Sequence, residues 1–94
     1  SIMGKKTYSF PHSLGKEEAL KRAKPMAENL ARKYMMKTVE TADGFHMTGK
    51  GAEATVVVTD NALEITMELS LLIEKLAGSQ IDSELNYKVP KALA

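Results

Sequence analysis

Two histidines, His12 and His46, are the side chains of this chain best suited to chemistry. An imidazole acts as a general base or binds a metal only with partners, either a nucleophile and an orienting group or several converging ligands. Neither histidine stands at a spacing typical of such a site, such as H-E-x-x-H. We therefore expect His12 to form a hydrogen bond that fixes a turn, and His46 to lie on the solvent-exposed face of a strand. The residues predict no catalytic group, metal site or cofactor, and hence a protein that is not an enzyme.

The stretch FPHSLGKEEA, residues 10–19, instead describes the start of a helix. Gly15 fits the N-cap position, and Glu18 then stands at N3, where its carboxylate can reach back to the cap amide. Leu14 and Ala19 are spaced as a small hydrophobic staple. This spacing predicts a helix that begins directly after Gly15.

An amphipathic pattern follows this start and gives the strongest secondary-structure signal in the sequence. Apolar residues from Ala19 to Tyr34 recur at steps of three and four, which places them on one helix face. Pro25 lies within the pattern, and we expect one kinked helix because the apolar stripe stays in phase across it. The other side of the helix is a candidate contact face for an anionic partner. Its basic residues are Lys16, Lys21, Arg22, Lys24, Arg32 and Lys33.

The remaining segments predict strands and one more helix. Extended patterns occupy residues 5–10, 36–41, 45–49, 54–59 and 63–70. Leu63 to Ser70 alternates apolar and polar residues, which is typical of a strand that is covered on one face only. A second helix is expected near residue 80, with Ser79 as its N-cap and Pro90 ending or bending it.

The predicted order is β-α-β-β-β-β-α, in a single domain that covers residues 1–94. A curled antiparallel sheet with two helices packed on one face is the natural two-layer arrangement for this order. The fold class is therefore α+β, and the element order resembles a reduced helix-grip domain. Such an analogy of order carries no function by itself.

Composition excludes several classes of protein. The chain has no cysteine, so disulfides and thiolate metal sites are excluded, and a cytoplasmic location is expected. No apolar run reaches the roughly 18 residues that span a membrane. The net charge is +1, although residues 1–37 carry nine Lys/Arg and three Glu. The second predicted helix begins acidic and no aromatic pair offers a stacking platform, so we expect no nucleic-acid partner.

Methionine is unusually frequent, with six residues against two phenylalanines and no tryptophan. Inward-facing methionines are either core filler or the lining of an adaptable apolar cleft. A cleft of this kind would need a pocket of roughly 300 Å³ or more. Its lining would include Met26, Leu30, Met47 and Met67.

The opening motif also resembles a known family. His12, Ser13, Leu14, Gly15, Glu18 and Ala19 match the pattern His-Ser-Leu-Gly, two variable residues, then Glu-Ala. The chain is similar in this motif, and in pattern from about residue 5 to 93, to the polyhydroxyalkanoic acid system proteins. Pro25 and Ala54 depart from the family pattern, which would have an uninterrupted helix and a glycine. The resemblance implies a context, the polyhydroxyalkanoate storage granule, and no established reaction.

Two functional hypotheses follow. The first is a non-enzymatic cytoplasmic accessory protein of polyhydroxyalkanoate granules, whose partners are the granule surface or its proteins. The alternative is a small binder or carrier of an apolar, acyl-type ligand held between helix and sheet. Self-association, the identity of the ligand and the choice between helix face and cleft stay open at this level.

Overall fold

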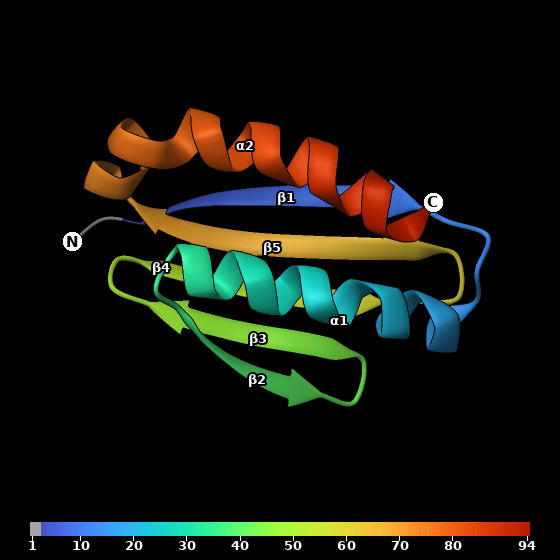
Figure 1. Cartoon of the computed structure of the whole chain (residues 1–94). Helices are drawn as coiled ribbons and strands as arrows, with labels where there is room; N and C mark the ends of the chain where they lie inside the picture. Colours follow the sequence, from blue (N-terminus) through green and yellow to red (C-terminus); the bar gives the residue numbers. More distant parts are fainter. Residues whose placement is uncertain (1–2) are drawn as a thin grey trace.

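Five antiparallel strands form one sheet in a computed structural model that describes residues 3–94 (Figure 1). The strands are β1 (Met3–Pro11), β2 (Lys37–Thr41), β3 (Gly44–Gly49), β4 (Ala52–Val58) and β5 (Ala62–Ser70). Their order in the sheet is β1-β5-β4-β3-β2, so the last strand pairs with the first. With helices α1 (Lys16–Lys33) and α2 (Leu71–Leu93), this confirms the α+β prediction and the order β-α-β-β-β-β-α.

The central strand β5 has the two-faced pattern that its sequence predicts. Its inward side chains, Leu63, Ile65, Met67 and Leu69, are all buried. Ile65 pairs with Tyr8 of β1 on one side and Val56 of β4 on the other. A shift by one residue would turn Glu64 inward, and the cost of burying that carboxylate fixes the register.

Helix α1 begins after Gly15, as predicted, and runs without a break through Pro25. Gly15 adopts φ 77°, a left-handed conformation that glycine tolerates best. The expected capping role of Glu18 is wrong, because its carboxylate accepts a hydrogen bond from Arg22 Nε at 2.8 Å instead. The first free amide, Lys16 N, donates to Asp60 Oδ1 at 3.2 Å, so a distant loop supplies the cap.

Helix α2 starts nine residues earlier than the sequence pattern suggests, so the predicted start near Ser79 is wrong. The N-cap is Ser70, whose hydroxyl accepts a hydrogen bond from Ile73 N at 3.2 Å. The helix continues through Gly78, which is buried, and through Pro90, which is exposed in its last turn. Pro90 therefore neither ends nor interrupts the helix.

Both helices cover the same face of the sheet and leave the other face to solvent (Figure 1). Helix α1 lies over β2, β3 and β4, whereas α2 lies over β1 and β5. The two helices run in opposite directions, so the C-terminal end of α1 lies at the same end of the sheet as the start of α2 (Figure 1). The hydrophobic core fills the layer between helices and sheet.

Replacing Ser70 by alanine removes the observed cap of α2 and should lower the free energy of unfolding by about 1 kcal/mol. The matched control is Ser79→Ala, which alters the cap expected from sequence but leaves Ser70 in place. Urea unfolding of both variants compares the two positions. Equal destabilisation of the two variants would contradict a helix start at Ser70.

Candidate functional site

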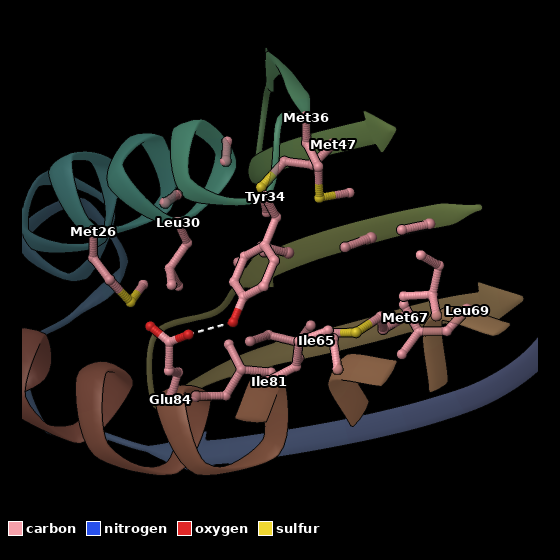
Figure 2. Close-up of a pocket in the computed structure, with 18 of the residues that line it drawn as sticks. Met26, Leu30, Tyr34, Met36, Met47, Ile65, Met67, Leu69, Ile81 and Glu84 are labelled. Atoms are coloured by element: carbon pink, nitrogen blue, oxygen red, sulfur yellow. Dashed lines mark hydrogen bonds between the residues drawn. The ribbon is translucent and has the colours of Figure 1, made fainter. Parts of the chain in front are cut away.

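A cavity of about 150 Å³ lies between the two helices and the sheet (Figure 2). Apolar side chains from α1, β3, β4, β5 and α2 form almost all of its lining. The four residues expected to line a cleft, Met26, Leu30, Met47 and Met67, all lie in this wall. Ile65, Leu69 and Ile81 also belong to the lining and are labelled in Figure 2.

Small side chains explain why space remains here. Ala27 and Ala31 of α1, Ala54 of β4 and Ala77 of α2 all line the cavity. Alanine side chains that face one another between helix and sheet leave space between the two layers. Neighbouring methionine side chains extend into this space but fill only part of it. The volume is about half of the pocket expected from sequence, and a cavity of this size accepts a benzene-sized group.

We infer that the cavity opens where α1 ends and α2 begins, because Lys50, the one exposed residue of its lining, lies there. Its lining there includes the exposed Lys50 and the half-buried Tyr34 and Ile73. The turn that carries Lys50 is tied to the start of α2 by a hydrogen bond from Ser70 N to Gly51 O, 2.8 Å long. We call this opening the mouth of the cavity.

One polar network crosses the cavity from helix to helix. Tyr34, just after α1, points toward α2, and its hydroxyl donates to Glu84 Oε1 (Figure 2). The other carboxylate oxygen of Glu84 accepts from Lys88 Nζ at 2.7 Å and lies 3.0 Å from Lys33 Nζ. The network therefore links the two helices across an otherwise apolar wall.

Charge and burial hold this network in one protonation state. The hydrogen bond from Lys88, aided by that from Tyr34, lowers the pKa of Glu84 to about 2. Burial, together with the hydrogen bond to Glu84, raises the pKa of Tyr34 to about 12. Near neutral pH the carboxylate is thus charged and the phenol protonated, which are the forms that this hydrogen bond requires. No local sequence pattern indicates this pair, because 50 positions separate the two residues.

The basic face predicted on α1 is largely engaged in ion pairs. Lys24 lies 3.0 Å from Glu40, Arg22 binds Glu18, and Lys33 binds Glu84. Lys16 pairs with Asp43. In the described part of the chain, only Lys21 and Arg32 of the six candidates form no ion pair. Little unneutralised charge therefore remains along this helix for an anionic partner.

The opening motif, residues 12–19, forms the turn between β1 and α1 and the first turn of α1. His12 Nδ1 accepts a hydrogen bond from Leu14 N at 3.1 Å, and its Nε2 lies 3.0 Å from the carbonyl oxygen of Thr59. A carbonyl only accepts, so Nε2 carries the proton in this arrangement. The imidazole thus joins this turn to the β4–β5 turn, the fixing role predicted for it. Ser13 is exposed beside it, and Ala19 is fully buried.

His46 lies on the open face of the sheet, where its Nδ1 is 3.0 Å from the hydroxyl oxygen of Thr55. Its side chain is not part of the cavity lining. Across residues 3–94, no three histidine, aspartate or glutamate side chains gather in a way that could hold a metal ion. Neither α1 nor α2 is long and apolar enough to cross a membrane.

The chain matches the model of a known protein family. The model of a family described as polyhydroxyalkanoic acid system protein matches residues 8–93 of the 94-residue chain. Among curated proteins, no match to the chain is found.

The Glu84 network should make stability depend on pH at the acid end. Because the folded pKa of about 2 lies below the ordinary 4.5, ionised Glu84 stabilises the fold above pH 4.5, and this contribution is lost as pH falls toward 2. Glu84→Gln should therefore lower the melting temperature at pH 7, and the difference from wild type should shrink toward pH 2. Circular dichroism melts across this range measure it. The control is Glu64→Gln, on the open face of the sheet, and an equal effect of both changes at every pH would contradict the assignment.

Proposed function

Since the chain belongs to the polyhydroxyalkanoic acid system protein family, we propose that it binds an apolar, acyl-type ligand within that system. The observation that carries the proposal is the cavity between α1, α2 and the sheet, whose lining is almost entirely apolar and has one exposed residue, Lys50, at one end. Ligand sites of this kind combine an apolar interior with a few polar groups that orient the ligand.

The cavity limits the size of the acyl tail. A volume of about 150 Å³ suits an apolar group of about six carbon atoms, as in benzene-binding cavities of that size. Methionine side chains turn easily between rotamers, so Met26, Met47 and Met67 can widen the space for a somewhat longer chain. A tail of this length gains free energy by leaving water, at about 0.8 kcal/mol per buried methylene.

The mouth suits a polar or anionic head group. Lys50 belongs to the lining and its exposed side chain can place an ammonium group beside a carboxylate. A tail inside and a head at Lys50 orient the ligand along the cavity. The Tyr34 side chain crosses the cavity and obstructs it. Breaking its single hydrogen bond to Glu84 would let the ring move aside and make room for an alkyl chain to enter.

We further propose that the protein is a cytoplasmic accessory of the polyhydroxyalkanoate granule and has no catalytic activity. The family description supports this context. A non-enzymatic role is supported by the use of His12 in fixing a turn and by the place of His46 on the face of the sheet opposite the helices.

Binding is testable through the methionine methyl groups. Hexanoate titrated into protein with labelled methionine methyls should shift the signals of Met26, Met47 and Met67, while the exposed Met35 stays unchanged. Ala77→Phe places a ring into the mouth side of the cavity and should weaken binding at least about tenfold. The matched control, Ala92→Phe, lies on the same helix outside this lining and should bind as wild type does.

Two results would count against the ligand proposal. One is the absence of any shift at millimolar hexanoate, and the other is equal binding by the Ala77→Phe and Ala92→Phe proteins. Acetate serves as the ligand control, because its single methyl group gains little from an apolar cavity.

Granule association has a separate test. Isolated polyhydroxyalkanoate granules should carry the protein with them on sedimentation, to a greater extent than an unrelated small protein of similar charge. Equal recovery of both proteins would contradict the association, whatever the outcome for hexanoate.

A further inference from the structure

Large apolar side chains are exposed around the mouth of the cavity. The first two turns of α2 present Leu72 and Leu76, which are 65% and 74% exposed, and Met35 after α1 is 90% exposed. Grouped apolar exposure of this kind is a feature of interaction sites in soluble proteins. We call this group the apolar rim: Met35, Leu71, Leu72 and Leu76.

Backbone contacts bring the members of the apolar rim to one end of the molecule. Gly49 packs against Met36 and the carbonyl of Met35, and Gly51 packs against Ser70 and Ile73. The β3–β4 turn thus lies between the end of α1 and the start of α2 (Figure 1). Lys50, at the centre of this turn, belongs to the cavity lining, so the apolar rim flanks the mouth.

Met35 occupies a backbone position that favours glycine. It has φ 57°, and it follows α1 where Met36 N closes the helix by donating to Ala31 O at 2.8 Å. Glycine is the usual residue at such a helix end because it adopts this left-handed conformation without strain. A long apolar side chain that points into solvent at this place is costly for the fold. This cost is explained if the Met35 side chain contacts another molecule.

Two free ammonium groups lie beside the apolar rim. Lys50 and Lys75 are exposed, and neither pairs with a carboxylate in residues 3–94. Glu53 and Glu68 lie near this end of the sheet but on its open face, opposite the helices. Glu74, the acidic residue in the first turn of α2, is neutralised by Lys6 at 2.9 Å. This end of the molecule therefore combines exposed apolar groups with free ammonium groups.

We propose that the apolar rim docks on an anionic phospholipid layer, with the mouth of the cavity facing that layer. Leucine and methionine enter the boundary between head groups and acyl chains, while lysines meet the anionic head groups. Two copies of the chain pressed together through this end would bring their lysines face to face, so repulsion disfavours that alternative. Docking would place the mouth where acyl-chain ligands concentrate. This inference goes beyond granule association, because it names the surface and its lipid chemistry.

Vesicle flotation tests the proposal with the whole chain. Wild-type protein should float with vesicles of equal phosphatidylglycerol and phosphatidylcholine, and far less with phosphatidylcholine alone. Leu72→Glu combined with Leu76→Glu should reduce binding at least about tenfold, since two apolar groups no longer enter the layer. The matched control is Tyr87→Glu, on the same helix and 64% exposed but far along it from the mouth, which should bind as wild type does.

Met35→Gly separates docking from folding. It should keep or raise the melting temperature, because glycine relieves the left-handed backbone, and yet weaken vesicle binding. Equal binding to both vesicle types would overturn the proposal. Vesicle binding at the wild-type level by the Leu72→Glu, Leu76→Glu protein would also overturn it. The same holds if the wild-type protein binds no vesicles but forms a dimer that this double change abolishes.

The hexanoate titration distinguishes this inference from the ligand proposal. The Leu72→Glu, Leu76→Glu protein should still show the hexanoate shifts, because neither leucine lines the cavity. If hexanoate binds but vesicles do not, the docking inference fails alone. If vesicles bind but hexanoate does not, the ligand proposal fails alone.

Discussion

The packing of small side chains between helix and sheet is the constraint on which the rest of this structure depends. Helix α1 meets the sheet through a stripe of alanines, Ala19, Ala23, Ala27 and Ala31, none more than 3% exposed. Such a stripe lets the helix lie close to the sheet, and longer neighbours must fill the space beside it. Toward its C-terminal end these neighbours are methionine, leucine and tyrosine, and they leave the cavity.

The same constraint accounts for the polarity of the site. Hydrogen bonds from Lys88 and Tyr34 keep Glu84 charged by lowering its pKa, while burial and the bond to Glu84 raise the pKa of Tyr34 and keep its phenol protonated. The mouth opens where the chain leaves α1 and enters α2, and the unpaired lysines and exposed leucines gather there. Ligand binding and surface docking therefore depend on one end of the molecule.

Helices and strands with a regular apolar period could be predicted from the sequence, whereas contacts between residues far apart in the chain could not. The alternation in β5 and the stripe of α1 each follow from one period, and Met26, Leu30 and Met67, which lie on the inward faces of these two elements, line the cavity. Helix α2 was misplaced because exposed leucines and the buried Gly78 obscure its apolar face over the first turns. Tyr34–Glu84 and Lys16–Asp60 depend on the relative placement of separate elements, for which no local pattern carries a signal.

A crystal structure of the protein soaked with hexanoate shows whether an apolar tail enters the cavity. We expect an alkyl chain between Met26, Met67 and Ile81, with its carboxylate toward Lys50 and the mouth. A hexanoate-soaked crystal in which methionine side chains close this space, with no alkyl chain inside, would contradict this expectation.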